Sequence, residues 1–283
     1  GHFTTTHDAE SRPAPPAERR TAAAIHRAGA TAMSVPERVP APGVVLPVSA
    51  LVVAVAGWWA LTVALAIPPF LLPSPTAVGA RLAGNPDLYL TNAVTTLRKI
   101  LLGGAVGIGA GFGIALVVWA VPVLERAVYP YLVAARVLPK IAVAPIFLIY
   151  FGVGFETALL FVALIVFFPV VVGTAAGLDR TPDSHLDLLR SVDADPVRIF
   201  VAVRLPHALP DVFAGVKQSV TLAVVGAVVA EWILSNDGLG SLILVASENV
   251  QVDVMLAALA VLLCLGLLLY GGVSLCYRAV AWQ

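Results

Sequence analysis

The sequence predicts an all-α, polytopic integral membrane protein with about six transmembrane helices. Of its 283 residues, 59% are hydrophobic and 12% are charged, whereas a soluble domain has about 25% charged residues. Several apolar stretches also reach the roughly 20 residues that a helix needs to cross the hydrocarbon layer. The net charge is zero, so the composition indicates neither a basic surface for nucleic acid nor an acidic tail.

Composition divides the chain into two regions. Residues 1–43 are polar and rich in proline, so we expect a disordered N-terminal segment on the cytoplasmic side. Residues 44–283 contain the apolar stretches and form the expected transmembrane domain. The two cysteines, Cys264 and Cys276, both fall in the last apolar stretch, where packed or lipid-facing thiols are expected rather than a disulfide or a metal pair.

The expected spans are separated by charged or proline-rich segments. The third should be broken, because Pro130, Pro139 and Pro145 interrupt it and Arg136 and Lys140 lie inside it. The six expected spans cover residues 44–67, 100–120, 126–151, 157–178, 211–234 and 254–277.

Three glycines recur at every fourth position of the second expected span. Gly103, Gly107 and Gly111 share one helix face and allow another helix to approach closely. Packing within the chain is the expected use of this face, and a contact with a second copy of the chain is the alternative.

Arginine positions predict the orientation. They gather before the first span, between the fourth and fifth spans and after the sixth, so both termini and the central loop should be cytoplasmic. The segment 234–253 carries acidic residues and no Lys or Arg, and should face outside. Arg98 and Lys99 depart from this pattern at the outer start of the second span. They either snorkel to the interface or belong to a short amphipathic helix before the span.

The central loop, residues 184–206, has the most informative local pattern. Residues 187–192 favour a short helix, Asp193 tolerates the left-handed backbone that ends it, Asp195 can cap a second helix, and Pro196 suits that helix's first position. Residues 197–203 should form this second helix, which ends before Leu205 and Pro206. The predicted element lies across the membrane face and offers a shaped surface to a cytoplasmic partner.

This loop resembles the EAA loop of type I ABC-importer permeases. That motif is Glu-Ala-Ala, three residues, Gly, nine residues, Ile, any residue and Leu-Pro. Here Asp187, Leu188 and Leu189 stand at the Glu-Ala-Ala positions and Asp193 at the Gly, and nine residues beginning with Ala194 lead to Val203-Arg204-Leu205-Pro206. The spacing is kept and several residues differ. Asp193 matters most, because it places a side chain where the family packs tightly against its ATPase. The resemblance assigns the coupling contact to Asp187, Leu188, Leu189, Val192, Asp193, Ala194, Asp195, Val203, Leu205 and Pro206.

Further segments are similar to the nitrate, sulfonate, taurine and pyrimidine-precursor branch of these permeases. They are residues 136–145, 205–210, 213–215, 229–231 and 238–240. The resemblance implies an inner-membrane permease that forms a homodimer, binds a cytoplasmic ABC ATPase and receives a small-molecule substrate from an extracytoplasmic binding protein. A pyrimidine or riboflavin-type heterocycle is preferred over a sulfonate or nitrate.

The chain itself has no phosphate-binding loop. Its only lysines are Lys99, Lys140 and Lys217, and none completes Gly-x4-Gly-Lys-Ser/Thr. No catalytic constellation stands out, and His185 and His207 lack a further ligand at metal spacing. We therefore expect a non-catalytic subunit without a metal or cofactor, with ATP and Mg²⁺ bound by the partner ATPase.

Four residues are candidates for the translocation path or its gate. Arg136, Pro139 and Lys140 lie in the broken third segment. Arg136 and Lys140 either border the path or clamp the break, or they only snorkel or neutralise the backbone carbonyls that Pro139 frees. Glu231 near the outer end of the fifth span either acts in gating or in contact with the binding protein, or anchors the helix at the interface. The alternative function is a secondary transporter driven by an ion gradient, which usually shows internal repeats that are not found here. A membrane enzyme is disfavoured.

Overall fold

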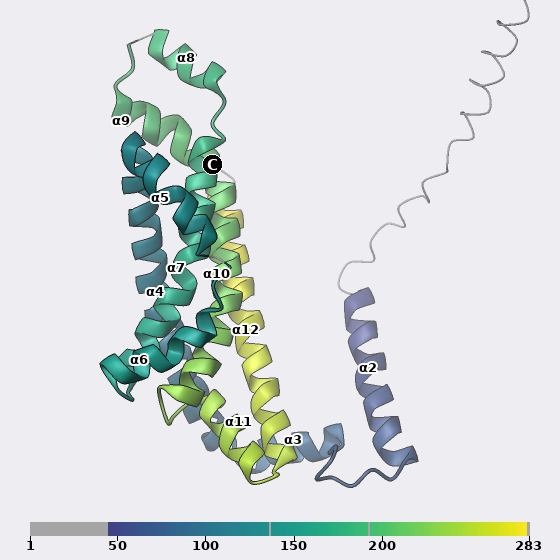
Figure 1. The fold of residues 1–283 in the computed structure, drawn as a ribbon. Coiled ribbons are helices and arrows are strands. Elements are labelled where there is room, and N and C mark those ends of the chain that lie inside the picture. Colours follow the sequence, from purple (N-terminus) through teal and green to yellow (C-terminus); the bar gives the residue numbers. More distant parts are fainter. Residues whose placement is uncertain (1–44, 136, 192, 282–283) are drawn as a thin grey trace, which may run out of the picture. The chain divides into compact units, whose positions relative to one another are not determined.

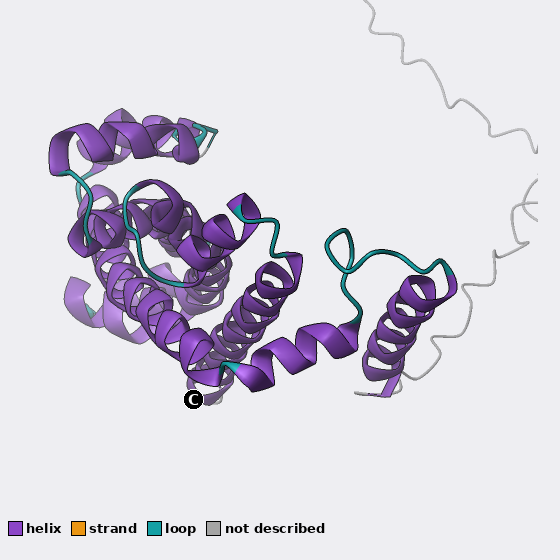
Figure 2. Ribbon diagram, turned by 90° about the horizontal axis from the view of Figure 1, so that it is seen from below, coloured by secondary structure: helices purple, strands orange, loops and turns teal. Residues whose placement is uncertain are grey.

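The computed structural model describes residues 45–135, 137–191 and 193–281. The predicted disordered segment, Arg136 and Val192 therefore lie outside the described residues. Within the described ranges all regular elements are helices (Figure 2), which confirms the all-α prediction. The chain divides into two units, Gly1–Val53 and Ala54–Gln283. The first long helix, α2 (Val45–Ala64), contains no charged residue.

Five helices in the described residues are long and apolar enough to cross a membrane. The expected spans one, two, four, five and six each correspond to one of them. They are α2, α4 (Pro86–Ala120), α7 (Phe155–Asp179), the continuous helix Pro196–Ile233, and α12 (Val252–Ala281).

The third apolar segment is broken, as its prolines predict. It consists of α5 (Pro122–Ala134), a short 3₁₀ helix, η1 (Lys140–Val143), and α6 (Ala144–Phe151). A proline removes one backbone donor and its ring clashes with the preceding turn, so a continuous helix cannot pass Pro139 and Pro145 without distortion. Each piece is shorter than the roughly 20 residues needed to cross the bilayer alone.

The beginning of α4 corrects one expectation. The helix begins at Pro86 rather than near residue 100, so Arg98 and Lys99 both lie inside it. Arg98 is exposed, but Lys99 is completely buried, so it does not snorkel. No separate amphipathic helix adjoins Lys99. The short helix α3 (Pro75–Gly84), whose N-terminus is capped by Ser74, ends before α4 begins.

The glycine face of α4 packs within the chain. If Gly103, Gly107 or Gly111 were replaced by a residue with a side chain, its Cβ atom would lie only 2.5–2.8 Å from a backbone carbonyl oxygen of α7. Only glycine allows two helix backbones to come this close. The close approach joins α4 to α7, and α10 (Leu205–Ile233) packs against both of these helices.

The two ends of the helix bundle carry different elements (Figure 1). One end holds α8 (Asp183–Ser191), α9 (Pro196–Ile199) and the C-terminal end of α12. The opposite end holds α3 and α11 (Leu239–Glu248), which pack on the first half of α12 through Val78, Ile243 and Ala257.

Candidate functional site

The coupling loop, residues 184–206, forms two helices joined by a tight turn. The predicted first helix is present as α8 and ends at Ser191. Asp193 then adopts φ 53°, as predicted, and the Ala194 amide donates to the Leu189 carbonyl at 3.1 Å. This bond spans five residues and is typical of a left-handed helix C-cap. Asp187 in α8 and Asp193 at the turn are both exposed, and Val192 lies outside the described residues.

The second helix begins at the predicted residue. Asp195 precedes α9 and Pro196 is its first residue, as a proline without an amide donor allows. The Asp195 side chain makes no capping hydrogen bond, however. Its carboxylate is exposed and therefore available at the surface of the loop.

Replacing Asp193 with glycine should stabilise this turn. A left-handed backbone costs an L-residue with a Cβ about 1 kcal/mol, and glycine avoids that cost. We expect Asp193→Gly to raise the thermal unfolding temperature slightly. The matched control is Asp195→Gly, because Asp195 has an ordinary φ of −57°. Equal effects of the two substitutions would contradict this explanation.

The predicted end of the second helix before Leu205 and Pro206 is wrong. A π-helical turn, η2 (Phe200–Arg204), follows α9 and runs directly into α10. A wider turn accommodates the missing donor and the bulk of Pro206 without ending the helix. The second half of the coupling loop, from Pro196 onward, is consequently the first part of a helix that continues to Ile233. Val203, Leu205 and Pro206 belong to that helix rather than to a break.

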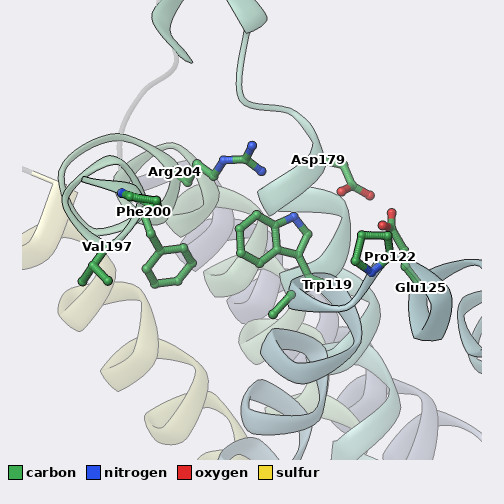
Figure 3. A pocket seen from close by; sticks show the side chains of 9 residues that line it. Trp119, Pro122, Glu125, Asp179, Val197, Phe200 and Arg204 are labelled. Atoms are coloured by element: carbon green, nitrogen blue, oxygen red, sulfur yellow. The ribbon is translucent and has the colours of Figure 1, made fainter. Parts of the chain in front are cut away.

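Three side chains join the coupling loop to the end of α4, and we call them the aromatic joint. The Arg204 guanidinium lies over the Trp119 ring at 4.7 Å, and the Phe200 ring centre lies 5.5 Å from that of Trp119 (Figure 3). A cation over an indole face and two packed rings both stabilise a contact. The loop is therefore held against the end of α4 by these side chains.

A cavity of 590 Å³ lies beside the aromatic joint. Its wall includes the side chains of Glu125 and Asp179, which lie across Trp119 from Phe200 (Figure 3). On the neighbouring surface Arg180 donates to Asp211 at 2.6 Å and links the ends of α7 and α10. The ring centres of His185 and His207 lie 5.2 Å apart, and the two rings are tilted by 48°. In the described ranges these histidines belong to no group of three potential metal ligands.

Of the residues predicted for the translocation path, the three that the structure describes do not come together. Pro139 precedes η1, and the Lys140 ammonium lies 5.3 Å from the centre of the Phe168 ring of α7. Arg136 lies outside the described residues. Glu231 is separate from both, because its side chain is buried against α4.

A buried polar cluster surrounds Glu231 at the end opposite the coupling loop. The Lys99 ammonium donates to Glu231 Oε1 at 3.1 Å, to Ser235 Oγ at 2.8 Å, and to Asp237 through its carbonyl at 2.8 Å and Oδ1 at 2.7 Å. The side chains of Lys99 and Glu231 are both 0% exposed. A charged pair is stable at such a position only when its hydrogen-bonding groups are satisfied.

The same cluster caps the first turn of α11. The Gly240 amide donates to Glu231 Oε2 at 2.7 Å, and the Leu239 amide donates to Thr96 Oγ1 at 2.8 Å. Thr96 in turn donates to Glu231 Oε1 at 2.8 Å. A carboxylate at a helix N-terminus also faces the positive end of the helix dipole. We call Asn92, Thr96, Lys99, Glu231, Ser235 and Asp237 together the polar clamp.

Asp237 closes the exposed side of the polar clamp. Burial raises the pKa of its carboxyl, but hydrogen bonds from Lys99 and Ser235 outweigh that effect and hold the pKa below its ordinary value. Asp237 thus stays ionised and paired with Lys99 in mildly acidic as well as neutral surroundings. The sequence drew attention to Lys99 and Glu231 for separate reasons and did not indicate that they form a pair. The sequence placed Lys99 at the outer start of the second span, and only a helix that begins at Pro86 puts this lysine inside, where it requires a partner.

These features agree with a family comparison. Residues 106–281 match the family described as "Binding-protein-dependent transport system inner membrane component". The chain belongs to this family. Members of the family are membrane permease subunits without catalytic activity of their own, and ATP hydrolysis belongs to a partner ATPase. Membership implies an ATPase and a substrate-binding protein as partners and a multi-pass location in the inner membrane.

Related proteins of similar sequence are also transport permeases, which agrees with the family assignment. A probable ABC transporter permease protein of Haemophilus influenzae is 35% identical over 216 residues, which are 76% of this chain and 88% of the relative. The formylaminopyrimidine permease ThiX of Halalkalibacterium halodurans is 36% identical over 64% of this chain and 73% of its own length. The riboflavin permease RibX of Chloroflexus aurantiacus is 32% identical over 86% of this chain and 91% of its own length.

A solved structure shares the fold of the permease. The matching chain comes from inward-facing conformations of the MetNI methionine ABC transporter. The TM-score is 0.61 at 19% identity, and the match covers 70% of this chain and 98% of that chain. At this identity the comparison supports the fold alone.

Proposed function

We propose that two copies of this permease form the translocation path of a type I ABC importer and that each copy binds a separate ATPase through its coupling loop. The observation that carries the proposal is the geometry of residues 183–204. Two short helices project from one end of the bundle, and the aromatic joint connects them to α4. Closure of the ATPase pair would move this rigid unit and shift the helices between inward and outward access.

The proposed orientation places both termini and the coupling loop in the cytoplasm. Arginines at the coupling loop and near the C-terminus support it, because Lys and Arg favour the cytoplasmic side of a membrane protein. The end of α12 and α8 lie at the same end of the bundle, which agrees with a shared side. The external binding protein would then approach the opposite end, which carries α3 and α11.

The proposed substrate is a small organic heterocycle of the pyrimidine or riboflavin type rather than a sulfonate or nitrate. Support comes from ThiX and RibX, whose names state a formylaminopyrimidine and riboflavin. A thermal-shift screen of the partner binding protein tests this choice. We expect stabilisation by pyrimidines or flavins and none by taurine, alkanesulfonates or nitrate. Stabilisation only by a sulfonate would reassign the substrate and leave the coupling proposal unchanged.

Replacing residues 187–194 with a Gly/Ser linker tests the coupling loop. We expect complete loss of ATPase co-purification and of ATP-driven uptake, because α8 and its C-cap provide the docking surface. The control replaces the turn 249–251 at the other end of the bundle with the same type of linker, and should retain the ATPase. An ATPase that stays bound to the 187–194 variant would refute the proposed docking role.

A further inference from the structure

The Lys99–Glu231 pair does not form a substrate-binding site. The three protons of the Lys99 ammonium face four acceptor atoms, and the side chain is 0% exposed. Among the described residues, the walls of the cavities beside Trp119, Ser219 and Phe147 do not include Lys99 or Glu231. A buried lysine whose donors are all used acts on the protein itself rather than on a passing molecule.

The polar clamp holds the start of α11 by side chains. Three successive backbone amides, those of Gly238, Leu239 and Gly240, donate to Asn92 Oδ1, Thr96 Oγ1 and Glu231 Oε2 at 3.1, 2.8 and 2.7 Å. Two of these acceptors belong to α4 and one to α10. The position of α11 is therefore determined jointly by two of the long helices.

The fit at this turn leaves no room for a different arrangement. Gly238 has φ 100°, which favours glycine, and a Cβ there would overlap the Glu231 carboxylate. A Cβ on Gly240 would lie 2.9 Å from both Glu231 Oε2 and the Cα of Val228. The turn can consequently move only if α4, α10 or the Lys99–Glu231 pair moves with it.

The outer side of the same turn is accessible. Asn236 is exposed, and the Asp237 side chain is 55% exposed although its Oδ1 accepts from Lys99. A molecule that contacts this turn would therefore act on Lys99 through one residue. The turn lies at the end opposite the coupling loop, where the proposed binding protein approaches.

We propose that Lys99 is a positioning residue of the transport cycle. Together with Glu231 it couples the turn 234–238 and α11 to α4 and α10, so that contact of the binding protein at this end reaches the membrane-spanning helices. The aromatic joint attaches the coupling loop to the other end of α4. The two contacts make α4 the connection between the binding-protein side and the ATPase side. This inference rests on the proposed function.

The test uses the complete transporter, with permease, ATPase and substrate-loaded binding protein, in lipid nanodiscs. ATP hydrolysis is measured with and without the binding protein, and amide exchange is measured at residues 238–240. For Lys99→Met we expect stimulation by the binding protein to fall at least tenfold, hydrolysis without it to stay within twofold of wild type, and exchange at 238–240 to rise at least tenfold. The matched control is Arg98→Met, which removes the neighbouring exposed charge and should leave all three values unchanged.

Two results would overturn the inference. In one, Lys99→Met is stimulated as strongly as wild type. In the other, hydrolysis with and without the binding protein falls in parallel, as a merely structural role would require. A wild-type complex that retains no ATPase would instead overturn the proposed function, and amide exchange at 238–240 would still test the clamp.

Two double variants keep the test decisive if Lys99→Met does not fold. Lys99→Met with Glu231→Gln removes both charges, leaves no unpaired buried ion, and should fold but show the same loss of stimulation. Lys99→Glu with Glu231→Lys keeps the charges but places an ammonium against the Gly240 amide. Stimulation should not return, and its recovery would refute the positional role of the two residues.

Discussion

Glu231→Ala should lower the free energy of unfolding of the permease by about 3–5 kcal/mol, as expected when one partner of a buried ion pair is removed. Three donors lose an acceptor at once: the Lys99 ammonium, the Thr96 hydroxyl and the Gly240 amide. Lys99 keeps Ser235 and Asp237, but Asp237 is half-exposed and cannot fill the space of the missing carboxylate. The measurement is unfolding in detergent micelles by titration with SDS.

The control for this prediction is Glu248→Ala, which removes an exposed carboxylate at the end of α11 and should change stability by less than about 0.5 kcal/mol. A double-mutant cycle with Lys99→Met isolates the coupling between the two residues. We expect the double variant to be more stable than the sum of the single losses predicts. Additive losses would show that Lys99 and Glu231 do not stabilise one another.

Gly107→Leu should destabilise the permease by at least about 3 kcal/mol, the upper end of the cost of overpacking. A Cβ at position 107 would lie 2.5 Å from the Ala163 carbonyl oxygen and 2.9 Å from the Val166 Cβ. Both obstacles belong to the rigid helix α7, so α4 and α7 would have to separate along their whole contact. Thermal unfolding in micelles and the yield of folded protein measure the effect.

Gly109→Leu is the matched control, since it adds the same side chain to the same helix two residues further on. A Cβ there meets nothing within 4 Å. This variant should unfold at the wild-type temperature. Equal destabilisation by the two substitutions would contradict this explanation, because only position 107 approaches α7 closely.

The coupling loop was largely predictable because its signals are local. A left-handed backbone at Asp193 and a proline at the start of α9 follow from the residues themselves. The helix that continues through Leu205 and Pro206 was not predictable in the same way. A proline normally ends a helix, and only the wider turn of η2 shows how this one continues.

The broken third segment contains one feature that the sequence predicted and one that it did not. Its prolines predicted the break, and the structure confirms separate helices α5 and α6. The partner of Lys140 could not be predicted, since the Phe168 ring beneath it belongs to another helix. The same holds for the aromatic joint, in which Trp119 and Arg204 come from helices far apart in sequence.

The sequence by itself determined that this protein lies in the membrane, which five segments form its long apolar helices, and where two short helices lie between the fourth and fifth expected spans. Apolar length, proline positions and the charges near helix ends are properties of single segments, so they can be recognised without a fold. Only the tertiary structure decided that Lys99 binds Glu231, 132 residues away, and that Gly107 packs against Ala163. Such contacts depend on which faces of the helices meet. A buried charge requires a partner, but its own sequence neighbourhood does not say which helix provides it.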